Sequence, residues 1–147
     1  MTQQTLLKAP DLRQTFPRSP NETLGCFVIL PRIIDKCRAS IAGTQGEYKY
    51  NCPLDRRFFD FTGVDADKLK NLAAEGKSDE ALLEFVNTTR KNLSEDNILA
   101  WCYQERTRRP DNPDAQAFFE ALRRSGCPSN HQVETWFQLL DAEEKRI

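Results

Sequence analysis

Apolar residues recur every three or four positions between residues 30 and 41 of the chain. The recurring residues are Leu30, Ile33, Ile34, Cys37 and Ile41. This spacing places them on one face of an α-helix. Pro31 suits the first turn of such a helix, where its missing N–H costs nothing, and Gly43 is a suitable stop. The pattern therefore predicts a helix that begins near residue 30 and ends near residue 43.

Two shorter helices are expected after this one. The first carries Leu54, Phe58, Phe59 and Phe61 and ends at Gly63, and the second covers residues 65–75. Between the long helix and these two, residues 46–51 alternate aromatic and polar side chains, which predicts one short extended stretch. The apolar run at residues 26–30 allows two interpretations, an extra helical turn or a strand-like segment that leads into the long helix.

The second half of the chain contains four helical patterns, each with a start signal. Ser78 and Ser94 are each followed by two acidic residues, which suit the first turn of a helix. Pro113 begins a third pattern that closes at Gly126. Ser129 and Gln132 have the spacing of a capping box, which predicts a last helix carrying Val133, Trp136, Phe137 and Leu140.

Residues 1–25 have little periodicity and contain Pro10, Pro17 and Pro20. Proline removes a backbone donor and restricts the residue before it, so residues 17–20 cannot be the interior of a helix. We expect an extended arm that packs on the domain through Leu12, Phe16 and Leu24. The whole pattern predicts an all-α fold, a compact single-domain bundle of about six helices over residues 1–147, with a proline-rich N-terminal arm.

Composition narrows the functional classes without selecting one. The 147 residues carry a net charge of −1, which gives no support for a nucleic-acid partner. The charge is uneven: residues 1–74 hold 11 basic and 8 acidic residues, and residues 75–147 hold 10 and 14. The longest apolar run has five residues against the roughly 20 that span a bilayer, so no membrane crossing and a cytoplasmic location are expected. The oligomeric state stays open.

Cysteine and histidine usage predicts no bound metal and no other cofactor. The five cysteines are an odd number without a CxxC pair, and His131 is the sole histidine. This set lacks the spacing of a zinc site. Because the sequence shows no secretory signal pattern and its cysteines are odd in number, we expect them to be free thiols in a reducing compartment. Nucleotide-binding glycine loops and hydrolase motifs are also missing from the sequence.

The charged residues of the long helix are the first candidates for a functional site. Arg32 and Lys36 lie roughly opposite its apolar face, Asp35 lies to one side, and Arg38 is nearer the flank. On an exposed helix these charges would form ion pairs worth about 0.2–0.5 kcal/mol each. If the arm or residues 48–57 cover them, they become desolvated. A free arginine fork would then bind a carboxylate or a phosphate.

Three further residues join this candidate site. Cys52 precedes a helix start and has arginines nearby in sequence, which favours a reactive thiolate, although His131 would have to be recruited across the fold. Tyr48 and Tyr50 alternate, so one is expected to face inward and the other the charged face. Tyr50 is the candidate to line the pocket, and Arg18 in the arm is a further cation.

Several of these segments together resemble a known family of proteins. They are Pro17–Pro20 (PRSP), Leu24–Gly25, Leu30–Ala39 (LPRIIDKCRA), Gly43, Tyr50–Asp55 (YNCPLD), Phe58–Phe59 and Thr62–Gly63. In these segments the chain resembles an uncharacterised bacterial family, domain of unknown function 5069. The resemblance implies a short cytosolic protein whose signature residues coincide with the polar candidates above, and it implies no activity.

Two functions are consistent with these observations. The first is binding of a small anion by Arg18, Arg32, Lys36, Arg38 and Tyr50. In this case Asp35 and Cys52 are the candidate catalytic groups of a cofactor-free acid–base enzyme. The second is a protein-interaction module that uses the acidic helical second half or the proline-rich arm.

Overall fold

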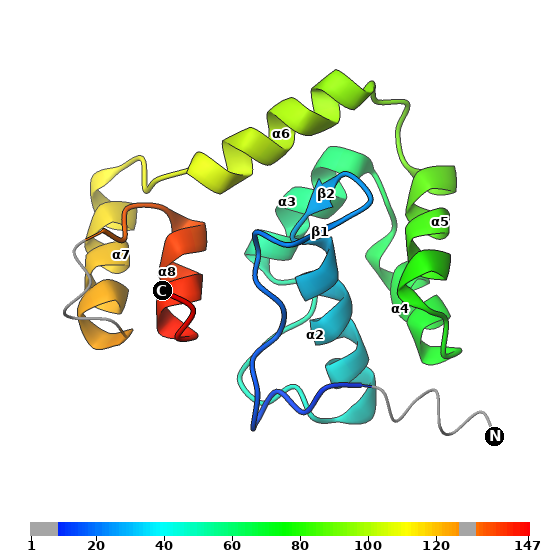
Figure 1. Cartoon of the computed structure of the whole chain (residues 1–147), viewed down its shortest axis with the longest axis horizontal. Coiled ribbons are helices and arrows are strands. Elements are labelled where there is room, and N and C mark those ends of the chain that lie inside the picture. The colour runs from blue at the N-terminus through cyan, green and yellow to red at the C-terminus, as the bar shows by residue number, and fades with distance from the viewer. Residues whose placement is uncertain (1–8, 127–131) are drawn as a thin grey trace.

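The computed structural model describes residues 9–126 and 132–147. Within these ranges the chain forms seven helices and one two-stranded hairpin (Figure 1), so the predicted all-α class is confirmed. The elements are β1 (Thr23–Leu24), β2 (Phe27–Val28), α2 (Leu30–Ala42), α3 (Pro53–Thr62), α4 (Ala66–Ala74), α5 (Asp79–Thr89), α6 (Glu95–Thr107), α7 (Pro113–Gly126) and α8 (Trp136–Glu143).

Helix α2 occupies the middle of the molecule (Figure 1). Its bounds follow the local signals, since Pro31 lies in its first turn and Gly43 ends it with a positive φ of 76°. A side chain at this φ would be strained, and glycine avoids that strain. On the apolar face of α2, Leu30, Ile33, Ile34 and Cys37 are buried and Ile41 is partly buried, and the helix packs against α4 and the hairpin.

The main core is built around this apolar face from the hairpin and α2–α6. Aromatic rings form much of it: Phe58 contacts Phe27 and Phe59 edge to face, with centroids 5.5 and 5.4 Å apart. Phe61 stacks on Trp101 of α6 at 4.6 Å. Such aromatic pairs add to the stability that burial of their area already gives.

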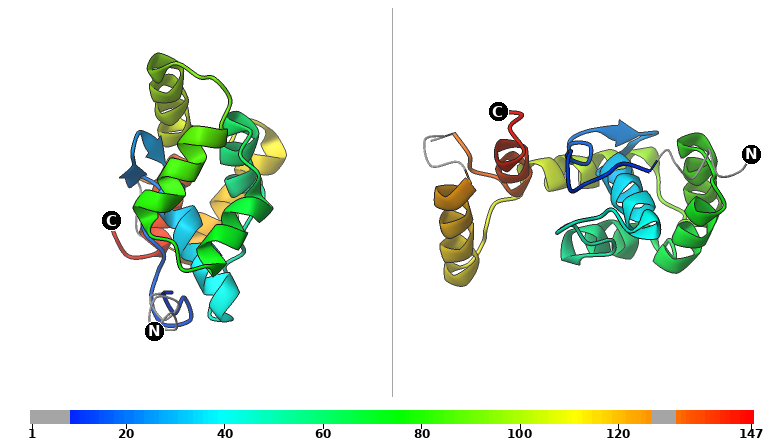
Figure 2. Two further views of the ribbon diagram at one scale, coloured as in Figure 1. Left: turned by 90° about the vertical axis from the view of Figure 1, so that its right-hand side faces the viewer. Right: turned by 90° about the horizontal axis from the view of Figure 1, so that it is seen from below.

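A second, smaller core lies between α7 and α8, at the other end of α6. Phe119, Val133, Leu139 and Ala142 form it, and the Phe119 ring meets Trp136 edge to face at 5.0 Å. Figures 1 and 2 show α7 and α8 side by side at this end of the molecule. The opposite side of α8 contacts α6, and its Phe137 belongs to the main core. Helix α8 therefore joins both apolar clusters.

The structure resolves or corrects several local expectations. Residues 26–30 include strand β2, which pairs antiparallel with β1 in the register Thr23–Val28 and Leu24–Phe27, so the strand interpretation is confirmed. Residues 46–51, for which a short extended stretch was expected, form no strand: 46–47 and 50–51 are turns, and 48–49 have no regular structure. In the arm, Leu12 is buried but Phe16 is 45% exposed, so Phe16 is not the anchor expected.

The start of the last helix also differs from the prediction. Ser129 lies outside the described residues, and α8 begins only at Trp136, so the prediction that this helix carries Val133 is wrong. Thr135 is its N-cap and forms a capping box with Gln138, which is the role predicted for Ser129 and Gln132. In the described part of the chain, every helix is too short or too polar to cross a bilayer.

Candidate functional site

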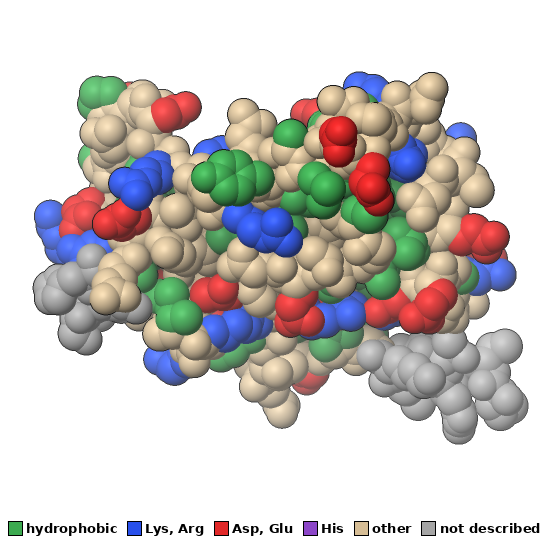
Figure 3. All heavy atoms as spheres, turned by 45° about the horizontal axis from the view of Figure 1, so that its top comes forward, with side chains coloured by type: hydrophobic (Ala, Val, Ile, Leu, Met, Phe, Trp, Pro, Cys, Tyr) green, Lys and Arg blue, Asp and Glu red, His purple; other side chains and the backbone are tan. Residues whose placement is uncertain are grey.

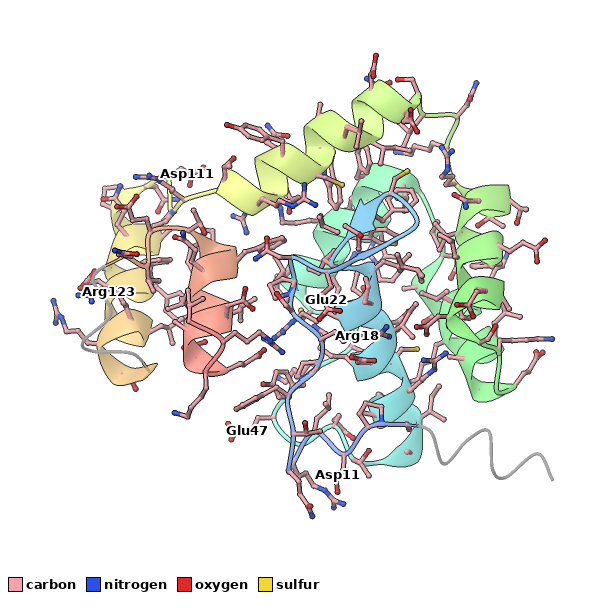
Figure 4. All side chains as sticks on the ribbon, in the orientation of Figure 1. Asp11, Arg18, Glu22, Glu47, Asp111 and Arg123 are labelled. Carbon is pink, nitrogen blue, oxygen red and sulfur yellow. The ribbon has the colours of Figure 1, made fainter. Side chains whose placement is uncertain are left out.

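The cationic side of α2 is covered by three segments that are distant in sequence. Residues 17–20 of the arm, the loop at residues 48–52 and the end of α8 all contact it. Arg32 is only 2% exposed and Lys36 4% exposed. Figure 4 shows Arg18 of the arm lying alongside α2. Because these charges are out of water, each needs a partner to offset the loss of hydration.

Glu144 is the partner of Arg32. The two Nη atoms of Arg32 donate to the two carboxylate oxygens of Glu144 at 2.9 and 2.7 Å, which is a bidentate pair. Arg32 also donates to the main-chain oxygen of Arg18 at 3.2 Å. The Tyr48 hydroxyl donates to Glu144 at 2.8 Å, and the Tyr48 ring lies 5.6 Å from the guanidinium of Arg32. The chain's own carboxylate thus occupies the position that a carboxylate ligand of Arg32 would take.

The end of the chain is held to the arm by further polar contacts. Arg146 donates to Glu144 at 2.5 Å, to Asp141 at 3.1 Å and to the main-chain oxygen of Pro17. Asp141 in turn accepts hydrogen bonds from Ser19 and Asn21 of the arm, both at 3.1 Å. These contacts fix the carboxylate of Glu144 above Arg32.

The pKa of Glu144 is lowered from its ordinary value by this environment. Burial acts in the opposite direction, but the hydrogen bonds and charge of Arg32, together with Arg146 and Tyr48, outweigh it. The Tyr48 hydroxyl has a raised pKa, first because it is buried and then because it donates to the Glu144 carboxylate. At neutral pH the group is therefore an ionised carboxylate held by an arginine and a neutral tyrosine.

Lys36 forms a second buried cluster one turn further along α2. Its Nζ lies 2.9 Å from Asp55 Oδ1 and 3.2 Å from the Cys52 sulfur. Asp55 also accepts a hydrogen bond from the main-chain N–H of Asn51, which has a φ of 61°. Cys52 is the N-cap of α3 and is half-buried. The ammonium of Lys36 is thus shared between the Cys52 sulfur and the Asp55 carboxylate.

Asp35, Arg18 and Arg38 belong to a third cluster, which is centred on Asp79 of α5. Asp35 accepts the main-chain N–H of Arg18 at 2.8 Å and pairs with its guanidinium at 3.0 Å. Asp79 accepts from Arg18 at 2.9 Å and from Arg38 at 2.7 Å. Burial would raise the pKa of Asp79, but the two arginines outweigh it and lower this pKa. The candidate catalytic carboxylate Asp35 thus anchors the arm to α2.

Tyr50 lies apart from these three clusters. Its hydroxyl donates to the main-chain oxygen of Ala66 at 2.7 Å, and its ring packs against Phe59 of the main core. The Tyr50 hydroxyl lies beside the Cys37 thiol, whose pKa is raised to about 11 mainly by burial. Of the two alternating tyrosines, Tyr48 is the one on the Arg32 side and Tyr50 is the one that faces inward.

A pocket of about 350 Å³ opens where the end of α2 meets α4 and the start of α5. Ile41, Ala42 and Ala73 supply apolar walls, and Arg38, Lys77 and Asp79 supply charged groups. Arg38 is held at the edge by Asp79 and by the main-chain oxygen of Lys77, which accepts at 2.9 Å. Of the candidates named from the sequence, Arg38 is the one that lines this pocket.

Sequence reasoning missed several residues of these clusters. Glu144, Asp55 and Asp79 neutralise the cations of α2 in the structure, and Asp141 fixes the arm. The sequence places Asp79 at a helix start, and nothing local connects it with Arg38, which is 41 residues away. His131, the partner considered for Cys52, lies outside the described residues. Within the described ranges, no group of three acidic, cysteine or histidine side chains is placed to hold a metal ion.

Comparison with known proteins gives one finding. Residues 14–146 match the model of the family described as "Domain of unknown function (DUF5069)". The match begins in the arm and ends at Arg146, so it includes all three charged clusters and every residue that lines the pocket except Ala9. No curated protein matches the chain.

Proposed function

We propose that the chain, which belongs to the family defined by domain of unknown function 5069, binds a small organic anion in the pocket between α2, α4 and α5. The ligand would be a carboxylate or a phosphate ester with a small apolar part. Arg38 would bind its charged group, and Ile41, Ala42 and Ala73 would contact its apolar part. The observation that supports this proposal is the position of an oriented arginine at the edge of a partly apolar cavity.

The size and lining of the pocket suit a small molecule. Ligand pockets typically have volumes of about 300–1,000 Å³ and combine apolar walls with a few placed polar groups. This pocket, at about 350 Å³, lies at the small end of that range. Apolar walls beside a guanidinium favour the binding of a molecule with one charged end and one hydrocarbon end.

The electrostatics of the pocket leave Arg38 able to accept a second anion. Asp79 is shared between Arg38 and Arg18, so its charge is divided between two guanidinium groups. Arg38 uses one N–H on Asp79 and another on the Lys77 carbonyl, and a guanidinium has further donors. Lys77 is exposed at the same pocket and adds a second cation. Glu80 is an exposed carboxylate of the lining and limits the charge that the ligand can carry.

Binding is better supported than catalysis. The candidate catalytic residues Asp35 and Cys52 do not line this pocket, and each is hydrogen-bonded within a charged cluster. Arg32 and Lys36 are paired with Glu144 and Asp55. In this proposal they support the structure of α2 and do not contact the ligand.

The proposal is tested by titrating the chain with small mono- and dicarboxylates and with phosphate. At 100 times its Kd a ligand should stabilise the fold by about 2.7 kcal/mol, which thermal unfolding detects. Arg38→Gln should weaken binding roughly tenfold or more, because a charge-assisted hydrogen bond is lost. Ala73→Leu should also weaken binding, because the larger side chain would occupy the space beside the apolar wall of the pocket.

The matched control is Arg13→Gln, which removes an exposed arginine that pairs with Asp11 outside the pocket. This variant should bind the ligand as tightly as the wild-type chain. If no anion of the series raises the unfolding midpoint, or if Arg38→Gln binds as tightly as Arg13→Gln, the proposal is wrong.

A protein-interaction module is the alternative function. The arm is a poor docking segment in this structure, since Pro17 and Pro20 are buried and Arg18 is held by Asp35. The helical second half is the better candidate for a docking surface, because Leu99 and Tyr103 of α6 are large apolar side chains exposed to solvent.

A further inference from the structure

Helix α6 has apolar residues on two opposite sides. On the inner side Ile98, Trp101 and Cys102 are buried in the main core. On the outer side Leu99 is 52% exposed and Tyr103 is 69% exposed. A helix that only covers a core normally carries polar residues on its outer side. Figure 3 shows hydrophobic side chains in the middle of the face over α6.

The outer side of α6 has the spacing of a helix–helix seam. Asp96, Leu99, Tyr103 and Arg106 follow one another at intervals of three, four and three residues. This alternation keeps the side chains on one stripe that can pack against a second helix. Asp96 begins the stripe with a negative charge, two apolar residues form its middle, and Arg106 ends it with a positive charge.

The two charges of this stripe have no ion-pair partner among the described residues. Asp96 and Arg106 are both exposed and appear in none of the ion pairs of the described chain. The arginine that does pair with α6 is Arg57, which contacts Glu105 on the inner side at 2.8 Å. Asp96 and Arg106 are therefore available to a second molecule.

We propose that the outer side of α6 binds the same side of α6 in a second copy of the chain, with the two helices antiparallel. In an antiparallel pair whose twofold axis crosses the outer side of α6 at the level of residue 101, Leu99 of one copy lies opposite Tyr103 of the other copy. The same axis places Asp96 of each copy opposite Arg106 of the other copy, so the interface has two such pairs of opposite charges. The stripe is thus complementary to itself in both shape and charge, as a twofold interface requires.

The opposite orientation is disfavoured by the same charges. In a parallel pair Asp96 would face Asp96 and Arg106 would face Arg106, and like charges across an interface are repulsive. A different protein would need no such self-complementary order of charges along the helix. The observations on α6 therefore favour a second copy over an unrelated partner.

The interface is small, so the dimer should be weak and depend on concentration. Helix α6 has 13 residues and is about 20 Å long, at 1.5 Å per residue. Interfaces that bury less than about 1,200 Å² are typical of weak or transient contacts. This inference rests on the alternative function and gives it a partner, and the pocket proposal does not depend on it.

Sedimentation equilibrium of the full chain over a concentration series tests the inference. The wild-type chain should change from monomer to dimer as its concentration rises. Tyr103→Glu should weaken association at least tenfold, because it places a charge opposite Leu99 in both halves of the interface. Phe118→Glu, which changes an exposed aromatic residue of α7 outside the stripe, should leave association unchanged.

Charge reversal distinguishes the antiparallel pair from other arrangements. Asp96→Arg and Arg106→Asp should each weaken the dimer, because each creates like charges across the interface. The double variant Asp96→Arg/Arg106→Asp should dimerise like the wild-type chain, since the opposite charges again face each other. In a parallel pair the double variant would keep like charges opposed and would show no such recovery.

Two results would overturn the inference, and they are distinct. A chain that stays monomeric at every concentration excludes the second copy as partner, whatever the pocket binds. A dimer that Tyr103→Glu leaves intact places self-association on another surface and excludes α6. Circular dichroism of each variant should match the wild-type spectrum, because all four substituted positions are exposed.

Discussion

Arg32 and Lys36 are buried against Glu144 and Asp55, whereas Arg38, at the far end of the same helix, is partly exposed beside a pocket. All three are cations of α2 with a carboxylate within 2.9 Å. The buried pairs have lost water, so each cation depends on its carboxylate for a counter-charge. Arg38 and Asp79 keep contact with solvent, and Asp79 pairs with Arg18 as well as with Arg38. Similar ion pairs therefore differ in their surroundings: two are closed off from water, and the third keeps contact with solvent beside the pocket where we propose that an anion binds.

The largest effect is expected from breaking the Lys36–Asp55 pair. Asp55→Asn should lower the free energy of unfolding by about 3–5 kcal/mol, because it leaves a buried ammonium without a counter-charge. Urea unfolding followed by circular dichroism measures this loss. The double variant Lys36→Met/Asp55→Asn should recover most of it, since no buried charge remains. A double variant as unstable as Asp55→Asn would show that shape, and not charge, dominates this cluster.

The Arg32–Glu144 pair should make stability depend on acid. The folded-state pKa of Glu144 is lowered, so its contribution is complete above the ordinary glutamate pKa and is lost as the pH falls through the folded value. Glu144→Gln should be less stable than the wild-type chain at pH 7, and the difference should shrink as the pH falls toward 3. Unfolding midpoints measured across this range test the prediction. A difference independent of pH would contradict it.

A smaller effect is expected at Asp79. Asp79→Asn should lower the free energy of unfolding by about 1 kcal/mol, because water can solvate the partly exposed Arg18 and Arg38 after their partner is neutralised. The same variant frees Arg38, so it should strengthen the binding of an anion at the pocket. Unfolding and ligand titration of one sample measure both changes. If Asp79→Asn lowered the free energy of unfolding as much as Asp55→Asn does, the partly exposed pair of α2 would not differ from its buried pairs.

The smallest effect is expected from an exposed pair on α3. Arg56 and Asp60 lie four residues apart, with 2.9 Å between their charged atoms. Asp60→Asn should change the free energy of unfolding by about 0.3–0.5 kcal/mol, as other exposed helical pairs do. This variant sets the baseline against which the other three are compared. The same urea unfolding assay measures it, and a change above 1 kcal/mol would contradict the prediction.

Helix positions were predictable from the sequence because their signals are local. Pro31 and Gly43 bound α2, Ser78 and Ser94 cap α5 and α6, and each signal acts within a few residues of the helix end. The predictions fail where two local signals compete. Ser129 and Thr135 are both followed by glutamine three residues later, and the structure shows α8 starting at the second.

The sequence by itself determined the helical class, most helix boundaries and the apolar face of α2. It also placed Arg32, Asp35, Lys36 and Arg38 outside that apolar face. Only the tertiary structure decided which carboxylate meets which cation: Glu144 is 112 residues from Arg32, and Asp79 is 41 residues from Arg38. Helical periodicity depends on neighbours within about four residues. The partner of a buried charge depends instead on which distant segments pack around it, and one helix pattern does not contain that information.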